Sequence, residues 1–197
     1  MESFTERTKR RLRDELLDAA YDAIVAGGYD CLRMAEVGRR TGVSRQTVYN
    51  EFGDKWGVLQ AVAARETERF LLQVNAALAE HTDPIRGLRA AVDRALTLAS
   101  DNPLVKAALG SPGSDQASQL LTTRGQQVLE LSHQRLDAHV REHWPEVSAD
   151  DANTCVDIAL RVVLSHIVNP GAAPSVVADQ VARVLGPFLS TRSRRNA

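Results

Sequence analysis

The sequence is poor in cysteine and aromatic residues, and it has no long apolar run. Its 197 residues include two cysteines, Cys31 and Cys155, which lie far apart and belong to no CxxC motif. We therefore expect both thiols to be reduced and buried; a regulatory disulfide between them is the alternative. The N-terminus lacks the apolar core of a signal peptide, and no segment reaches the ~20 apolar residues of a membrane span. These absences predict a cytoplasmic protein that does not insert into a membrane.

Strand patterns are also missing, because no alternating β-branched segment lies between hairpin turns. Apolar residues instead recur three and four positions apart along most of the chain, which is the spacing of amphipathic helices. A chain of this length buries roughly 70% of its unfolded surface and can form its own core. We predict an all-α fold with about nine helices and no cofactor.

Several predicted helices begin with capping residues. Asp83-Pro84 and Asn102-Pro103 each place a capping side chain before a proline at the first helical position. Ser148 with Asp151 resembles a capping box in which aspartate replaces the usual glutamate. The predicted helices are a first segment ending at Gly27-Gly28, residues 34–42, 45–51 and 54–80, two segments starting at 84 and 103, and residues 116–143, 148–167 and 174–190.

The helix predicted at 148–167 is apolar on most of its faces, and it is followed by a last helix at 174–190 that carries further apolar residues. Such helices need cover on most sides, and a domain of this size offers limited cover. We expect a homodimer built as a four-helix arrangement, with two helices from each chain; the alternative is a central helix in a monomeric bundle. The expected interface residues are Val156, Leu160, Val163, Leu164, Ile167, Val177, Val181, Val184 and Phe188.

The net charge of −1 conceals a basic cluster near the N-terminus. The segment "TERTKRRLR", residues 5–13, has Glu6 as its only acid. Taken alone, a terminal run of this kind is typical of a solvated, frayed chain end.

The segment "TGVSRQTVYNEF" has the turn and the length expected in a helix-turn-helix motif. Gly42 permits the sharp turn, Val43 fills the angle between the helices, and Ser44 caps the helix that follows. Val48 and Phe52 are four residues apart, so we expect both to face the core.

The opposite side of this helix carries hydrogen-bonding side chains. Arg45 can pair with guanine, whereas Gln46 and Asn50 can pair with N6 and N7 of adenine. The hydroxyls of Thr47 and Tyr49 can contact phosphate oxygens, which position a helix without reading sequence. We predict that this face enters the major groove of double-stranded DNA; the alternative is a solvated helix with a buried tyrosine.

This region resembles the DNA-binding domain of the TetR family of transcriptional regulators. The family signature is a G-V-S turn, then T-[VIL]-Y-x-x-F, then a short turn with a lysine and a leucine. The matching residues are Gly42-Val43-Ser44, Thr47-Val48-Tyr49, Phe52, Lys55 and Leu59. The resemblance implies a DNA-binding domain at residues 8–60, with the helix-turn-helix at about 33–52, and a ligand-binding and dimerisation domain at 61–197.

The resemblance also implies roles for single residues. The candidate base readers are Arg45, Gln46 and Asn50. The candidate phosphate contacts are Arg33, Ser44, Thr47, Tyr49 and Lys55. The basic cluster becomes an arm that approaches the DNA backbone or the minor groove through Arg7, Lys9, Arg10 and Arg11. Similar regulators are usually homodimers that release DNA when a small molecule binds, so we expect a near-palindromic operator and a repressor.

Two residues depart from the family pattern. Arg33 stands where serine or threonine commonly caps the second helix, and it exchanges that cap for a possible phosphate contact. Trp56 stands where many members have glutamate, which raises the local positive potential. Its indole can pack against the first helix or stack near the DNA backbone.

The sequence contains no recognisable catalytic or metal-binding set, so we expect neither an enzyme nor a metalloprotein. His139 and His143 have a spacing that can hold a metal, but "HVREH" lacks the HExxH order of zinc proteases. These two histidines are expected at the surface near a helix end.

Helices between 84 and 143 supply apolar walls with few charges, which is typical of a pocket for a small hydrophobic effector. The same pattern describes any core, and a domain that only dimerises or binds a protein is the alternative. The candidate pocket residues are Leu88, Val92, Leu96, Asn102, Leu104, Leu121, Arg124, Val128 and His133.

Overall fold

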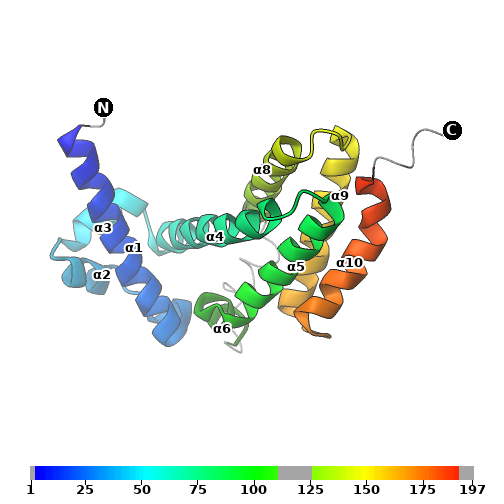
Figure 1. Ribbon diagram of the computed structural model, residues 1–197. Helices are drawn as coiled ribbons and strands as arrows, with labels where there is room; N and C mark the ends of the chain where they lie inside the picture. Colours follow the sequence, from blue (N-terminus) through cyan, green and yellow to red (C-terminus); the bar gives the residue numbers. More distant parts are fainter. Residues whose placement is uncertain (1–2, 111–125, 191–197) are drawn as a thin grey trace. The chain divides into compact units, whose positions relative to one another are not determined.

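The computed structural model describes residues 3–110 and 126–190, and the regular secondary structure in these ranges is entirely helical (Figure 1). The helices are α1 (Phe4–Cys31), α2 (Met34–Thr41), α3 (Arg45–Phe52), α4 (Lys55–Ala79), α5 (Pro84–Asp101), α6 (Pro103–Gly110), α8 (Gln126–His143), α9 (Ala149–Val168) and α10 (Pro174–Leu189). The all-α prediction is confirmed for these ranges. The first part of the helix predicted at 116–143 lies outside the described residues. Within the described ranges, no helix combines the length and apolarity needed to cross a membrane.

The chain forms two compact units. The first contains the residues up to Glu66 together with α6, and the second contains Thr67–Asn102 and the described residues from Gln126 onward. Helix α4 contributes residues to both. The sequence prediction placed the boundary near residue 60 and assigned α6 to the second domain, whereas Leu104 of α6 packs against the apolar cluster of the first unit.

The core of the first unit is built by α1, α2, α3 and the start of α4. Leu16, Val37, Val48 and Val58, one from each helix, are almost completely buried in a single cluster. Phe52 at the end of α3 is half-buried against the same cluster. The inward orientation predicted for Val48 and Phe52 is therefore confirmed, and the other side of α3 is left facing outward.

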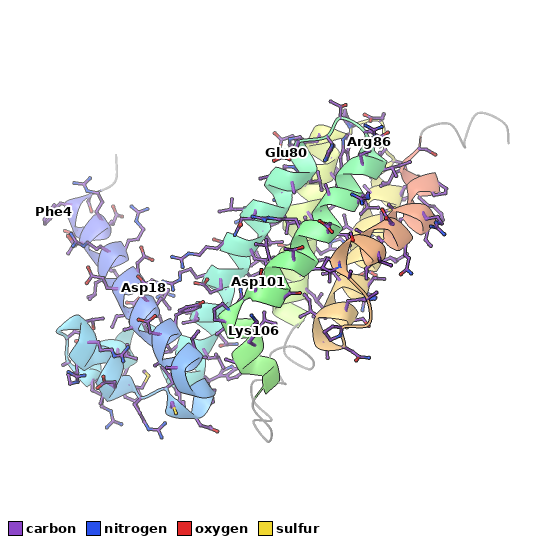
Figure 2. The ribbon with its side chains drawn as sticks, turned by 60° about the horizontal axis from the view of Figure 1, so that its bottom comes forward. Phe4, Asp18, Glu80, Arg86, Asp101 and Lys106 are labelled. Carbon is purple, nitrogen blue, oxygen red and sulfur yellow. The ribbon has the colours of Figure 1, made fainter. Side chains whose placement is uncertain are left out.

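Helix α1 begins at Phe4 and includes the whole basic cluster. Ser3 and Glu6 form a capping box, in which Ser3 Oγ accepts from the Glu6 amide at 3.2 Å and Glu6 Oε2 accepts from the Ser3 amide at 2.8 Å. Figure 2 shows Phe4 at this end of the helix, and its side chain is exposed. The frayed end predicted from charge alone is wrong, because these caps allow a helix to start before the basic residues.

The far end of α1 is kinked at Gly27 and Gly28. Both have non-helical torsion angles, and Gly28 has a φ of 73°, which favours glycine. The predicted break at this pair is correct, although helical residues continue to Cys31. Cys31 is exposed and Cys155 is buried. The prediction of two buried thiols is thus wrong for Cys31, which lies beyond the kink and outside the buried stripe of α1.

The second unit packs α5, α8, α9 and α10 side by side with the later part of α4, and α5 runs along α10 (Figures 1 and 2). Trp144, directly after α8, is 2% exposed. It lies so close to Gly87 of α5 that a Cβ there would be 2.4 Å from the indole ring. A glycine at this position is therefore required for the tryptophan to fill the core.

Two predicted caps are present in the second unit. Asp83 Oδ1 accepts from the Arg86 amide at 2.8 Å and starts α5 before Pro84. Ser148 Oγ accepts from the Asp151 amide at 3.2 Å and starts α9. The Asp151 carboxylate accepts from the Ser148 hydroxyl at 2.7 Å. Aspartate, which is shorter than the usual glutamate, thus binds the hydroxyl of the capping residue.

The apolar residues of α9 and α10 divide between the core and the surface. Four of the expected interface residues are buried in the core of the second unit: Val156, Val163, Val177 and Val181. Because they are covered by their own chain, they offer a partner little surface, and their assignment to an interface is corrected. Val184 and Phe188 are 65% and 53% exposed. The remaining three are half-buried: Leu160, Leu164 and Ile167.

Candidate nucleic-acid interface

The turn between α2 and α3 has tight, glycine-dependent geometry. Gly42 has a φ of 71°, and the Val43 amide donates to the Gly38 carbonyl oxygen at 2.9 Å. A Cβ at Gly38 would lie 2.8 Å from the Val43 carbonyl oxygen, so a larger residue would push the turn away from α2. Ser44 Oγ accepts from the Thr47 amide at 3.1 Å and caps α3. These contacts hold α3 at a defined angle to α2.

Four polar side chains of α3 form two pairs on its outer face. An Arg45 Nη donates to the Tyr49 hydroxyl at 3.0 Å, and the guanidinium lies 5.1 Å from the centre of the Tyr49 ring. Gln46 Nε2 donates to Asn50 Oδ1 at 2.9 Å. Arg45, Gln46 and Asn50 are exposed, whereas Tyr49 is half-buried against the core of the first unit. The candidate base readers are therefore accessible and already ordered by their neighbours.

The Gln46–Asn50 pair presents complementary groups on adjacent side chains. Because Asn50 Oδ1 accepts from Gln46, the pair retains Gln46 Oε1 as an acceptor and Asn50 Nδ2 as a donor. An acceptor beside a donor matches N6 and N7 of adenine in the major groove. The two amides can thus read one adenine together.

The one acid of α3 is neutralised by α1. Arg13 forms an ion pair with Glu51, and its guanidinium lies 4.9 Å from the centre of the Phe52 ring. An unpaired Glu51 would place negative charge next to the polar face of α3 and would repel phosphates. Arg13 also attaches the C-terminal part of α3 to α1.

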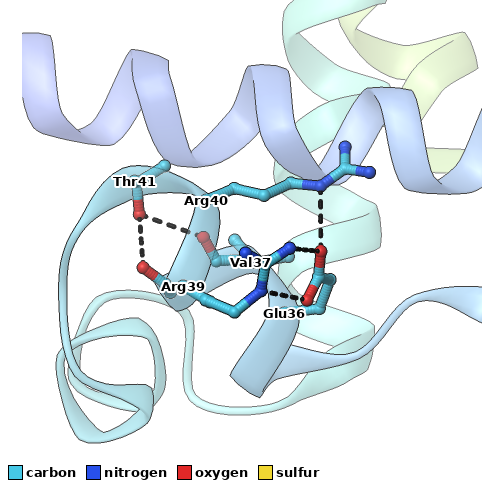
Figure 3. Close-up of polar contacts among 6 residues, drawn as sticks. Glu36, Val37, Arg39, Arg40 and Thr41 are labelled. Carbon is cyan, nitrogen blue, oxygen red and sulfur yellow. Dashed lines mark hydrogen bonds and ion pairs between the residues drawn. The ribbon is translucent and has the colours of Figure 1, made fainter.

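Helix α2 carries a second neutralised acid, Glu36 (Figure 3). Arg39 donates to both carboxylate oxygens, at 2.8 and 2.6 Å, and Arg40 donates to one of them at 3.2 Å. These hydrogen bonds lower the pKa of Glu36 to about 2. Thr41 Oγ1 donates to the Val37 carbonyl oxygen at 3.0 Å within the last turn. With two arginines on one carboxylate, this end of α2 keeps a net positive charge beside the turn.

Lys55 begins α4 next to the kinked end of α1. Its ammonium nitrogen lies 4.1 Å from the centre of the Tyr29 ring and 3.4 Å from the Asp30 carbonyl oxygen. Arg33 also donates to the Asp30 carbonyl oxygen. Burial, followed by the charge of Arg33, lowers the pKa of Lys55. Two of the candidate phosphate contacts, Arg33 and Lys55, thus meet at one backbone oxygen.

Trp56 packs against the core of the first unit. Its ring meets the Tyr29 ring edge-on, with centroids 6.4 Å apart and an angle of 71° between the planes. Of the two positions considered for this indole, packing and stacking near DNA, the structure shows packing.

The four residues expected to form a basic arm are exposed on the first turns of α1: Arg7, Lys9, Arg10 and Arg11. They project from a helix, and neighbouring side chains point in different directions. Arg7, Arg10 and Arg11 are three and four positions apart and share one side, which Lys9 does not. Arg11 is also paired with Glu15 at 3.0 Å.

The second unit contains an apolar cavity with a volume of about 90 Å³. Two of the candidate pocket residues, Leu88 and Val92, line it together with Trp144. Among its described lining residues, Ser132 supplies the one hydroxyl group and none carries a charge. Cys155 also lines the cavity, and burial raises the pKa of its thiol to about 11, so it is uncharged at neutral pH. The cavity is suited to an apolar group.

Other candidate pocket residues lie elsewhere. Leu96 is buried in the core of the second unit without lining the cavity, and Leu104 packs against the core of the first unit. Asn102 is the residue that ends α5, and His133 lies in a separate, more polar hollow. These four do not line this cavity, because helical spacing does not distinguish the cavity from the core around it. The remaining candidates lie outside the residues or side chains that the structure describes: Leu121, Arg124 and Val128.

His139 and His143 stack on each other, with ring centres 3.9 Å apart and 19° between their planes. Their parallel rings do not converge on a common point. Burial lowers the pKa of His139. The described residues contain no group of three or more histidine, cysteine or acidic side chains placed to hold a metal ion.

Two contacts of the candidate interface could not be predicted from local spacing: Arg13 with Glu51, and Tyr29 with Lys55. The partners in each pair lie on different helices and far apart in the sequence. The contacts of Glu36 with Arg39 and Arg40, in contrast, have the three- and four-residue spacing of helical ion pairs, which is a signal the sequence contains.

Both units resemble known proteins. Residues 16–62 match the family described as bacterial regulatory proteins, tetR family, and residues 83–187 match the family described as bacterial tetracyclin repressor, C-terminal domain. The HTH-type transcriptional regulator AlkX of Mycobacterium tuberculosis is 30% identical over 190 residues, which cover 94% of this chain and 88% of AlkX. The HTH-type transcriptional activator FasR of Mycolicibacterium smegmatis is 37% identical over 81 residues, which cover 41% of this chain and 37% of FasR.

A solved structure supports the same relationship. The TetR family repressor AlkX from Dietzia sp. strain DQ12-45-1b, implicated in biodegradation of n-alkanes, superimposes with a TM-score of 0.74 at 26% identity. The match covers 89% of this chain and 93% of that one. With both family matches and a relative spanning nearly the whole chain, this protein belongs to the TetR family of DNA-binding transcriptional regulators.

Proposed function

We propose that this protein is a homodimeric repressor that binds a near-palindromic operator and releases it when a small, largely apolar molecule occupies the cavity of the second unit. The observation that carries the DNA-binding part is the outer face of α3, where Arg45, Gln46 and Asn50 are exposed and ordered on a capped helix. Two such helices related by a two-fold axis would require an operator with matching symmetry.

The side chains around α3 divide into two roles. Base edges are read by Arg45, Gln46 and Asn50. Phosphates are bound by the remaining candidates: Arg33, Ser44, Thr47, Tyr49 and Lys55. Tyr49 accepts from Arg45, so its own hydroxyl hydrogen can still be donated to a phosphate oxygen. This hydrogen bond also links a base reader to a phosphate contact.

The exposed apolar residues of α9 and α10 form the proposed dimer surface. Ile158, Val176, Val184 and Phe188 are each more than a third exposed in the single chain. Exposed apolar residues on neighbouring helices are typical of a surface that a partner covers. Val184 and Phe188 belong to the interface predicted from the sequence, whereas Ile158 and Val176 are added from their exposure. The proposed interface therefore lies on the outer side of the same two helices.

An alkyl-chain compound is the proposed effector. The described cavity lining is apolar, with one hydroxyl from Ser132. The AlkX repressor from Dietzia is implicated in n-alkane biodegradation, which supports a ligand with a hydrocarbon chain. The cavity of about 90 Å³ is smaller than most ligand pockets. Binding a long chain would therefore move the surrounding helices, and that movement can couple occupancy to DNA release.

Whether the protein represses or activates transcription is proposed from relatives for which this is known. The Dietzia relative is a repressor and matches 89% of this chain, whereas the activator FasR matches 41%. The longer match includes the unit that contains the cavity, so we propose repression.

Selection of bound fragments from a random-sequence duplex pool tests the DNA-binding proposal. The purified dimer should enrich a near-palindromic sequence. A double variant, Gln46→Ala with Asn50→Ala, provides the control, since both side chains are exposed and their loss should leave the fold intact. Enrichment of no sequence by the wild-type protein would contradict the proposal.

A further inference from the structure

Tyr29 lies at the centre of a cluster that joins α1 to α4 within the first unit. The cluster consists of Tyr29, Asp30, Arg33, Lys55 and Trp56. The Lys55 ammonium faces the Tyr29 ring at 4.1 Å and approaches the Asp30 carbonyl oxygen at 3.4 Å. Lysine has a long, flexible side chain, so two contacts of this kind restrict the positions its charge can take.

The Tyr29 ring is itself held in place. Trp56 packs edge-on against it, with centroids 6.4 Å apart, and Tyr29 is half-buried at the edge of the core. The kink at Gly28, with its φ of 73°, precedes Tyr29 directly and sets the direction of the chain there. Burial, with the nearby charges of Asp54 and Asp30, raises the pKa of Tyr29, so the ring faces Lys55 as a neutral phenol at physiological pH.

Arg33 places a second positive charge beside Lys55. Arg33 shares the Asp30 carbonyl oxygen with Lys55, and its charge adds to that of the ammonium group. Keeping two cations close together is unfavourable unless other groups compensate. The Tyr29 ring and the Asp30 carbonyl oxygen provide that compensation in the free protein, and a DNA phosphate would provide more.

We propose that Tyr29 is a positioning residue for DNA binding, which holds the Lys55 ammonium where it meets a backbone phosphate. This inference rests on the proposed role of Lys55 as a phosphate contact. Ordering the lysine before binding lowers the entropy lost when the complex forms. Tyr29 therefore increases affinity for all DNA sequences alike and acts through Lys55.

A double-mutant cycle on a random-sequence duplex tests the proposal. Tyr29→Leu removes the ring face and should weaken binding about threefold to fivefold, the effect of a single exposed cation–π contact. Tyr29→Phe keeps the ring and should bind like the wild type. In a Lys55→Met background, Tyr29→Leu should have no further effect, because the charge it positions is already gone.

Each outcome has a defined meaning. An equal loss from Tyr29→Leu in the wild-type and Lys55→Met backgrounds would overturn the proposal, because Tyr29 would then act only through the fold. Loss of binding by Tyr29→Phe would overturn it as well. If Tyr29→Leu does not fold, Tyr29→Phe and Tyr29→Trp can be compared by salt titration. Both keep an aromatic face, so the salt dependence of their DNA affinity should have the wild-type slope. Failure of the wild-type protein to bind any duplex would instead contradict the proposed function.

Discussion

In the first unit, the proposed base readers lie outside the apolar core, whereas in the second unit the core, the cavity and the exposed face are built from the same residue types. Arg45 and Asn50 are exposed on a short capped helix, which favours a binding role for them. Val163 and Phe188 are both apolar residues on helices of the second unit, yet one is buried beside a cavity and the other is exposed. Polar residues on a surface can thus be interpreted from sequence, while apolar residues need a structure.

The largest expected difference is between the effects of two aspartate substitutions, one at a buried and one at an exposed apolar position of the second unit. Val163 is 8% exposed, so Val163→Asp buries an unpaired charge and should destabilise the fold by about 4 kcal/mol or more. Phe188 is 53% exposed, so Phe188→Asp should give a folded monomer. Losing the second DNA-binding unit should weaken operator affinity about 100-fold or more. Circular dichroism and light scattering distinguish the two results.

The same pair of variants can also contradict the distinction between core and interface. If Phe188→Asp remains a dimer, the interface lies elsewhere. If Val163→Asp folds and is monomeric, the buried face of α9 participates in dimerisation after all.

The next effect concerns the cavity. A straight-chain alcohol at about 100 times its dissociation constant should raise the stability of the protein by about 2.7 kcal/mol. It should weaken operator binding by about 1–3 kcal/mol through coupling between the sites. In a Trp56→Phe variant, Trp144 is the remaining tryptophan of the two in the chain, so its emission reports directly on the cavity.

Three results of this ligand experiment carry different conclusions. A change in Trp144 emission with weaker DNA binding supports a regulatory cavity. A change in emission with unchanged DNA affinity would show that the cavity binds ligand without regulating. No response to any chain length would favour a second unit that only dimerises or binds a protein.

A smaller effect is expected from the paired amides of α3. Gln46→Ala and Asn50→Ala should each cost about 1–3 kcal/mol on the operator. If the hydrogen-bonded pair reads one adenine, the double variant should lose no more operator-binding free energy than the more severe single variant loses. Selection with each single variant should also lose preference at the same base pair. Additive losses at two different base pairs would show that the amides read separately.

The smallest effect is electrostatic and depends on pH. Hydrogen bonds from Arg39 and Arg40 depress the pKa of Glu36 from 4.5 to about 2 in the folded protein. A depressed pKa stabilises the fold above pH 4.5, and this contribution disappears as the pH falls toward about 2. Wild type should therefore lose a small stability advantage over Glu36→Gln in that window. The exposure of the pair and screening by salt keep the effect small. A constant difference between the two proteins at all pH values would exclude this cause.

Much of the fold follows from local signals in the sequence. Asp83, Ser44 and Ser148 start helices as predicted, and Gly42 ends one, because capping depends on residues only a few positions apart. The four-residue spacing of Val48 and Phe52 also predicted which side of α3 faces the core. These features need no knowledge of the tertiary structure.

Other features depend on contacts between distant residues. The exposure of Cys31 follows from the kink in α1, and the burial of Val177 follows from its position against the other helices of the second unit. The contact between Tyr29 and Lys55 joins two helices and has no local spacing. Periodicity places apolar residues on one face of a helix. It does not show whether that face meets the core, a cavity or a partner.

The central claim is that α3 reads sequence through Asn50 while Lys55 binds the backbone. The most direct test measures the affinity of Asn50→Ala and Lys55→Ala for the operator and for a random duplex at several salt concentrations. Lys55→Ala should weaken both complexes equally and flatten the salt dependence by about one unit of slope. Asn50→Ala should cost about 1–3 kcal/mol on the operator and much less on the random duplex. If Lys55→Ala instead relaxes sequence preference and Asn50→Ala weakens both complexes equally, the proposed orientation of α3 in the groove is wrong.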